Sequence, residues 1–364
     1  MAASKPRYRS RLRALLVVGI GVSALEGAGY VDWAEDELNV QFHAFQDTRD
    51  ATILSPTIEL TKDFTDRTTL RAKFGLDAIS AASDSCVRCH RPGARDTRLL
   101  AGASVIHKLS DDTKLTVGAE VGHENFYQAT TVIAQISKRL NKGNTTVAGG
   151  YSFSLNRPQL HPAQRTENQF ASDAFASLTH TLTKTTVAQF GYEIAQIDGY
   201  QSSPFLRALI NGERAVGVSP DSRTRQTLSA RLRQALPLDS YLETDYRHYL
   251  DTWSIHSNSL QVGLSHYLTR QLLVNVSYRW YQQTGAFFFA PEYFGNPHYF
   301  TGDFRLQPFD SSLYGGRVVY TSRGRLLWLP EGAGLTAEYE FYRSTTGFQA
   351  AIFTGGVRIP LGNK

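Results

Sequence analysis

SYLETDYRHYLD, residues 240–251, is the stretch that decides the fold, because apolar and polar side chains alternate along its length. One face carries Leu242, Thr244, Tyr246, His248 and Leu250, and the other carries Glu243, Asp245, Arg247, Tyr249 and Asp251. Alternation with a period of two indicates a β-strand, and this one is about twice as long as the average strand of a soluble protein. The same division recurs in residues 270–283 and 223–233.

Sixteen segments of this kind follow one another along the chain. They are predicted at 37–47, 53–63, 67–78, 97–109, 113–126, 130–140, 144–155, 171–182, 184–196, 223–235, 240–252, 257–268, 270–284, 309–321, 333–344 and 350–361. Tight turns alternate with longer connections, which include 79–96, 156–170, 197–222 and 285–308. Strands of about 9–11 residues or more, apolar on one face and joined in this way, are typical of outer-membrane barrels. We therefore predict an all-β fold, a transmembrane antiparallel β-barrel of about 16 strands.

A soluble β-sandwich or β-helix is the alternative fold. Either one would bury many mid-strand charges without partners, at a cost of several kcal/mol each, whereas a wide barrel directs them into a water-filled lumen. The predicted lumen sets the Arg223, Arg225, Arg231, Arg233 face of one strand beside the Glu243, Asp245, Arg247, Asp251 face of the next. These charges either set the selectivity of a channel or form solvated cross-strand pairs that keep the lumen open.

The beginning of the chain predicts export. Residues 1–24 hold five basic residues, no acid and an apolar run from Leu15 to Ala24. This pattern favours a bacterial signal peptide, and the run is too short for the alternative, a membrane-spanning anchor. We predict a signal peptide at 1–28, cleaved near residue 24 or 28, and a single barrel domain at 29–364.

The charge of the chain indicates which partners to expect. The five leader bases account for the whole formal net charge of +5, because the remaining residues hold 33 bases and 33 acids. No nucleic-acid partner is therefore expected, and outer-membrane lipid is the expected surroundings of the barrel.

Both cysteines of the chain lie in Cys86-Val87-Arg88-Cys89-His90, within the connection 79–96. C-x-x-C-H is the attachment sequence of c-type haem, in which two thiols bind the haem covalently and the histidine is an axial iron ligand. The sequence predicts one haem c, bound by Cys86 and Cys89, with His90 as the proximal ligand. A Cys86–Cys89 disulfide and a zinc site are the alternatives, and the disulfide leaves His90 unexplained.

The second axial ligand of such a haem is left open by the sequence. The only methionine is Met1, which leaves with the leader, so a methionine ligand from this chain is excluded. Four histidines are predicted on lipid-facing positions near strand ends, namely His107, His180, His248 and His266. The candidate distal ligands are His43, which faces the predicted lumen, and His123, His161, His256 and His298, which lie at strand ends or in long connections. The aromatic connection 285–308 either covers the haem or a partner, or packs as part of the loops and the aromatic girdle.

Two resemblances follow from these residues. The stretch Asp77-Ala78-Ile79-Ser80-Ala81-Ala82-Ser83, after a strand containing Ser55-Pro56, resembles a motif of a widespread bacterial family of unknown function whose members look like outer-membrane barrels. The combination of one haem motif with about sixteen strands is similar to fused cytochrome-porins that oxidise iron outside the cell. There the motif precedes the first strand, whereas here it follows the third, so only Cys86, Cys89 and His90 carry over.

Three functions compete on the sequence alone. The first is electron transfer at or across the outer membrane, with a periplasmic cytochrome or another redox partner, because one haem cannot span about 30 Å of hydrocarbon. The second is a porin-like passive channel in which the cysteines form a structural disulfide. The third is a haem enzyme with an open iron site. With an even number of strands and both chain ends in the periplasm, the haem connection is expected on the extracellular side.

Overall fold

The computed structural model describes residues 36–48, 51–81, 94–124, 127–160, 165–203, 206–324 and 329–362. Its strands are β1 (Glu37–Asp47), β2 (Ala51–Thr65), β3 (Thr68–Ala81), β4 (Ala94–Ser110), β5 (Thr113–Glu124), β6 (Tyr127–Leu140), β7 (Thr145–Leu160), β8 (Arg165–Thr166), β9 (Gln169–Thr181), β10 (Thr186–Gly199), β11 (Arg207–Ile210), β12 (Glu213–Val216), β13 (Ser222–Leu236), β14 (Ser240–Asp251), β15 (His256–Tyr267), β16 (Leu272–Gln283), β17 (Phe309–Thr321), β18 (Gly334–Ser344) and β19 (Gln349–Pro360). Two 3₁₀-helices, η2 (Asn141–Gly143) and η3 (Phe304–Leu306), lie in connections.

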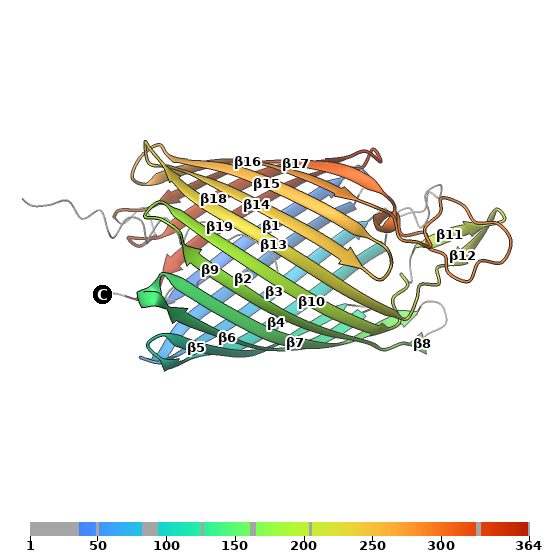
Figure 1. Ribbon diagram of the computed structural model, residues 1–364, viewed down its shortest axis with the longest axis horizontal. Helices are drawn as coiled ribbons and strands as arrows, with labels where there is room; N and C mark the ends of the chain where they lie inside the picture. The colour runs from blue at the N-terminus through green and yellow to red at the C-terminus, as the bar shows by residue number, and fades with distance from the viewer. Residues whose placement is uncertain are drawn as a thin grey trace, which may run out of the picture.

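The long strands close into a barrel. Each pairs antiparallel with its neighbour, and β1 pairs with both β2 and β19, so that the sheet has no free edge. Leaving out the short β8 and the separate β11–β12 hairpin, sixteen strands form the wall, tilted to the barrel axis (Figure 1). Closure gives every strand two hydrogen-bonded neighbours, as a membrane-spanning sheet requires. The fold is the predicted transmembrane β-barrel of outer-membrane type, and the sixteen predicted segments correspond to the sixteen wall strands.

The alternation of the sequence places apolar side chains outside and charges inside. Leu228 on β13, Phe190 on β10 and Val276 on β16 are more than half exposed on the outer face, where they would meet lipid. On the inner face, the register of β13 with β14 sets Arg231 opposite Asp245 and Arg233 opposite Glu243. The predicted lumen lining of this strand pair is therefore present in the structure.

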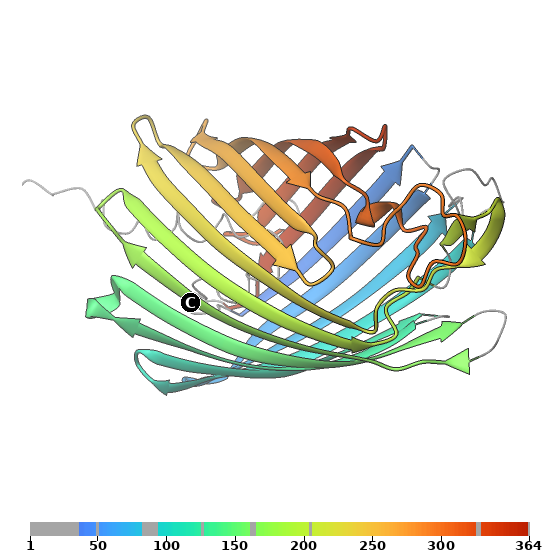
Figure 2. The ribbon, with the colours of Figure 1, turned by 45° about the vertical axis from the view of Figure 1, so that its right-hand side comes forward.

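The two ends of the barrel differ. One, called here the turn end, holds Glu37 at the start of β1, Pro360 at the end of β19, and short connections except for residues 322–333. The other, called the loop end, holds the longer connections between β3 and β4, β10 and β13, and β16 and β17. Figures 1 and 2 show the β11–β12 hairpin and the orange loop of residues 284–308 at this end.

Three connections at the loop end differ from the sequence prediction. The connection predicted at 156–170 is shorter, because β7 continues to Leu160 and β9 begins at Gln169, and it contains β8. The ladder of β3 with β4 continues to Ala81 opposite Ala94, so residues 79–81 and 94–96 belong to strands and the predicted haem connection narrows to 82–93. The connection 197–222, predicted without structure, contains β11 and β12. Asn211 and Gly212 join them with positive φ at both residues, which is the turn geometry that asparagine–glycine pairs favour in tight hairpins.

Within the described ranges, no helix is both long and apolar enough to cross a membrane.

Candidate functional site

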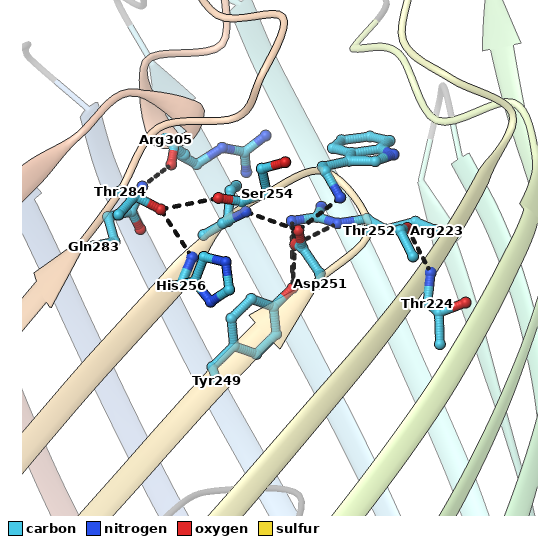
Figure 3. Close-up of polar contacts among 12 residues, drawn as sticks. Arg223, Thr224, Tyr249, Asp251, Thr252, Ser254, His256, Gln283, Thr284 and Arg305 are labelled. Atoms are coloured by element: carbon cyan, nitrogen blue, oxygen red, sulfur yellow. Dashed lines mark hydrogen bonds and ion pairs between the residues drawn. The ribbon is translucent and has the colours of Figure 1, made fainter.

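A buried ion pair marks the loop end of β13 and β14. The Nε of Arg223 donates to Asp251 at 2.9 Å, and the side chains of the two residues are only 9% and 0% exposed. Asp251 also accepts a hydrogen bond from the Tyr249 hydroxyl (Figure 3). Its other oxygen accepts from the backbone N–H groups of Trp253 and Ile255. Both carboxylate oxygens therefore have partners, which a buried charge requires to be tolerated.

A small hydrophobic cluster covers this ion pair. It consists of Trp253, Ile255, Ala286, Phe288 and Leu306, which come from the β14–β15 turn and from the loop 284–308. The Trp253 ring lies 4.1 Å from the Arg223 guanidinium and meets Phe288 edge-on at 5.1 Å between centroids. We call these five residues the mouth cluster. It packs over the ion pair and joins the loop to the β14–β15 turn.

Hydrogen bonds hold the loop 284–308 in this position. The side-chain amide of Gln283 donates to the carbonyl oxygens of Arg305 and Gln307 at 2.8 and 2.7 Å. The Tyr293 hydroxyl, inside the loop, donates to the carbonyl oxygen of Phe288 at 2.8 Å and accepts from the Thr301 N–H at 2.9 Å. The loop is thus a fixed part of the barrel mouth.

The β11–β12 hairpin is tied to the same loop. Ile210 and Val218 form isolated backbone bridges with Tyr293 and Phe300. The contact is close enough that a Cβ on Gly302 would collide with the carbonyl oxygen of Arg207. The two long connections at the loop end therefore form one cap.

A second ion pair lies on the inner side of the loop. Asp303 accepts from the backbone N–H, Nε and Nη2 of Arg305, at 3.0, 2.9 and 2.7 Å. This hydrogen bonding to the carboxylate raises the pKa of Arg305 above its ordinary value. The Arg305 side chain is 69% exposed, so a permanent, paired guanidinium stands in the space beneath the loop.

A cavity of about 690 Å³ lies between this loop and the wall. Its charged lining residues are Arg223, Arg225, Arg247, Arg305 and Asp303. The remainder is polar, with Asn156, Gln169, Ser257 and Thr301 among others, or apolar, with Ile197, Ile255 and Leu306. The lining holds four guanidinium groups and one carboxylate, and Asp251, which pairs with Arg223, adds a second carboxylate. The cavity therefore has a formal excess of positive charge.

Arg225 differs from Arg223 and Arg305 in its hydrogen bonding. It lies two residues after Arg223, on the same inner face of β13, and its Nε is buried without a hydrogen-bond partner among the described residues. Asp251, its register neighbour on β14, is already occupied by Arg223, Tyr249 and two backbone groups. A buried donor without a partner is uncommon in folded proteins and points to a missing acceptor.

Toward the turn end, the same two strands carry open ion pairs. Arg231 pairs with Asp245, and Arg233 lies 2.8 Å from Glu243, with 15–27% of each side chain exposed to the lumen. These pairs match the solvated cross-strand pairs considered from the sequence.

The sequence-predicted haem residues cannot be placed. Cys86, Cys89, His90 and the candidate distal ligand His161 lie outside the described residues, as does the predicted signal peptide. The described chain does place Ala81 and Ala94, the ends of the strands that flank the motif, at the loop end of the barrel. No group of three or more histidine, cysteine or acidic side chains in the described ranges is arranged to hold a metal ion.

The four described candidate ligands are dispersed. His43 faces the lumen in the middle of β1, where its Nδ1 is hydrogen-bonded to Thr354 at 2.8 Å. His123 stands at the loop end of β5, next to the outward-facing Val121, and His256 begins β15; both are exposed. His298, in the loop 284–308, packs against Tyr299 with 4.3 Å between ring centroids. The structure brings none of the four together.

The four histidines predicted at lipid-facing strand ends form hydrogen bonds to neighbouring strands. His107, His180 and His266, all near the turn end, are hydrogen-bonded through Nδ1 to Thr68, Thr145 and Ser240 of the neighbouring strands. His248 is bonded to Asn258. These pairs satisfy polar atoms on the outer face.

A family model described as "Protein of unknown function (DUF3570)" matches residues 156–351, more than half of the chain. The chain belongs to this family. The matched DUF3570 segment contains every residue that lines the cavity, from Asn156 to Leu306, and does not contain Cys86, Cys89 or His90.

The chain is similar to Pseudomonas aeruginosa OpdK crystallised with vanillate, with 9% identity, a TM-score of 0.48, and coverage of 89% of this chain and 98% of that one. It is similar to P. aeruginosa OccK5 (OpdH), with 9% identity, a TM-score of 0.49 and coverage of 90% and 98%. A BenF-like porin from Pseudomonas fluorescens gives 9% identity, a TM-score of 0.46 and coverage of 90% and 98%. No curated protein matches the sequence.

Sequence reasoning found the arginine face of β13 but missed the cap. Nothing in the local pattern indicated that Trp253 would meet Phe288, or that Asp303 and Arg305 would stand inside the mouth. The Asn211-Gly212 pair was a usable signal for the β11–β12 hairpin, since this dipeptide favours tight hairpin turns.

Proposed function

We propose that this member of the DUF3570 family is a porin-like channel of the bacterial outer membrane, through which small solutes diffuse passively. The observation that carries the proposal is the closed sixteen-strand barrel with an apolar outer face and a charged lumen. Barrels of about this size leave an aqueous space inside, whereas a sealed core would be apolar. The leader at 1–28 would direct export, and the loop end would face outward.

Conductance measurements test the channel. Purified full-length protein inserted into planar lipid bilayers is expected to give stepwise current increases in 1 M KCl, because ions can follow the hydrated lumen. Cys86→Ala is the control variant, and its conductance is expected to equal that of the wild type. Folded barrels, verified by heat-modifiable gel mobility, that insert without any current would contradict the proposal.

The haem motif supports a second candidate, a haem-bearing barrel in electron transfer at the outer membrane. The observation is Cys86-Val87-Arg88-Cys89-His90 between β3 and β4, whose strand ends lie at the loop end. Cys86 and Cys89 would hold one haem c covalently and His90 would be the proximal ligand, with His123, His256 and His298 on strands or loops of the same end. A bound haem would supply one-electron transfer, and a periplasmic cytochrome or another redox partner would complete the path.

Spectroscopy of purified outer membranes separates the two candidates. Covalently bound haem is expected to give a pyridine haemochrome band that disappears in Cys86→Ala and Cys89→Ala. Protein without this band, with both thiols protected from alkylation until reduction, would indicate a structural disulfide instead. A Soret shift on addition of cyanide would identify an open iron site and favour an enzyme over a carrier.

A further inference from the structure

We propose that the cavity beneath the loop 284–308 is a binding site for small organic carboxylates, and that Arg225 binds the carboxylate group. The inference deepens the proposed function and rests on it in one respect, since the solute must reach the lumen. It names the solute class that the channel would bind on its way through.

The charge of the cavity selects an anion. Four arginine side chains line it, and the two nearby carboxylates, Asp251 and Asp303, are each engaged by an arginine of their own. In a partly enclosed space, the positive charge of Arg225 attracts anions and repels cations more strongly than it would in bulk water. The opposite preference would require free carboxylates in the lining.

The hydrogen bonding identifies Arg225 as the residue that contacts the ligand. Arg223 on the same face is paired with Asp251, and Arg305 is paired with Asp303 through two side-chain nitrogens. The Nε of Arg225 is buried without a hydrogen-bond partner in the described chain, and its side chain lines the cavity. A carboxylate accepts two parallel N–H bonds from a guanidinium, so it supplies the missing acceptor and balances the charge.

The apolar part of the lining indicates an organic anion. Ile197, Ile255 and Leu306 contribute to the walls, and hydrocarbon placed against them leaves water. A bare inorganic anion would satisfy Arg225 but would make no use of these walls. The volume of about 690 Å³ is within the range of ordinary small-molecule sites.

Calorimetric titration tests the inference on the full-length protein in detergent micelles, with protein-free micelles as the blank. The probes are cyclohexanecarboxylate, the neutral cyclohexanecarboxamide and inorganic phosphate. The carboxylate is expected to bind at least about tenfold more tightly than either of the others, because only it combines the charge with an apolar body. Equal affinity for the amide or for phosphate would overturn the assignment.

Substitution locates the site. Arg225→Gln is expected to weaken binding of the carboxylate by about tenfold or more, since it removes a charged hydrogen-bond donor. The matched control is Arg317→Gln on β17, a lumen-side arginine that does not line the cavity, although its Nε is also buried without a hydrogen-bond partner among the described residues. The affinity of this variant for the carboxylate is expected to stay within about twofold of the wild type. Unchanged affinity in Arg225→Gln, or equal losses in both variants, would overturn the inference.

Two further observations keep the test decisive. If Arg225→Gln does not fold, Arg225→Lys is measured in its place. Lysine keeps the positive charge but lacks the planar guanidinium that binds a carboxylate through two N–H groups, so affinity for the carboxylate is still expected to fall. Full affinity in the lysine variant would overturn the bidentate contact. Because calorimetry needs no open pore, a barrel that conducts without binding contradicts only this inference, and one that binds without conducting contradicts only the proposed channel.

Discussion

The two halves of the β13–β14 strand pair contain the same residue types and behave differently. Near the turn end, Arg231 with Asp245 and Arg233 with Glu243 lie on the lumen side of the wall with 15–27% of each side chain exposed. At the loop end, Arg223 and Asp251 are 9% and 0% exposed beneath the mouth cluster. Water screens the first two pairs, whereas the covered pair depends on its own hydrogen bonds. The difference comes from the loop that covers one end.

The largest effect is expected from Asp251→Ala. It leaves Arg223 charged and buried beside Trp253 and removes the acceptor of two backbone N–H groups, so the barrel should lose about 3–5 kcal/mol of stability. Urea titration of the folded protein in lipid vesicles measures this loss. A loss below about 1 kcal/mol would show that the pair is not isolated from water.

Opening the cap is expected to make the ion pair at the loop end of β13–β14 as accessible to water as the pairs near the turn end. Trp253→Ala removes the ring that lies over Arg223 and packs on Phe288, so water should reach the ion pair and the loop 284–308 should be cut more readily by protease. In this background, Asp251→Ala should cost about 2 kcal/mol less than it does in the wild type. Additive losses in the double-mutant cycle would contradict the role given to the mouth cluster.

The smallest effect is expected from Asp245→Ala. Its partner Arg231 keeps access to lumen water and lies 3.8 Å from Glu243, so the loss should be below about 1 kcal/mol and should shrink further at high salt. The same urea titration, run at low and high salt, measures it. A loss comparable to that of Asp251→Ala would remove the distinction between the two halves.

Much of the wall was predictable because each strand carries its own pattern. The alternation in 240–251 fixes which side chains face lipid and which face the lumen, whatever the neighbouring strands are. The predicted cross-strand pairing of Arg231 and Arg233 with acids of the next strand was also accessible, because consecutive strands of such a barrel are neighbours. The extents of β3 and β4 were underestimated, since their ladder continues beyond the apolar pattern to Ala81 and Ala94.

The cap and the cavity were not predictable in the same way. Phe288 and Trp253 are brought together by a loop whose path depends on backbone hydrogen bonds, such as that from the Phe287 N–H to the Trp253 carbonyl oxygen at 2.9 Å. The docking of β11–β12 onto Tyr293 joins segments more than eighty residues apart. No local periodicity encodes contacts of this kind, because each loop contributes only half of them.

The sequence by itself therefore determined the barrel, its lumen-facing charges and a C-x-x-C-H motif in the third connection. The alternation of a strand and the spacing of a C-x-x-C-H motif both depend only on residues that are close together in the sequence. Only the tertiary structure decided that the Arg223–Asp251 ion pair would be buried, that the Nε of Arg225 would be buried without a hydrogen-bond partner in the described part of the chain, and that a cavity would form beside it. Burial depends on which residues pack over a side chain, and in this protein they come from the loop 284–308, which follows β16.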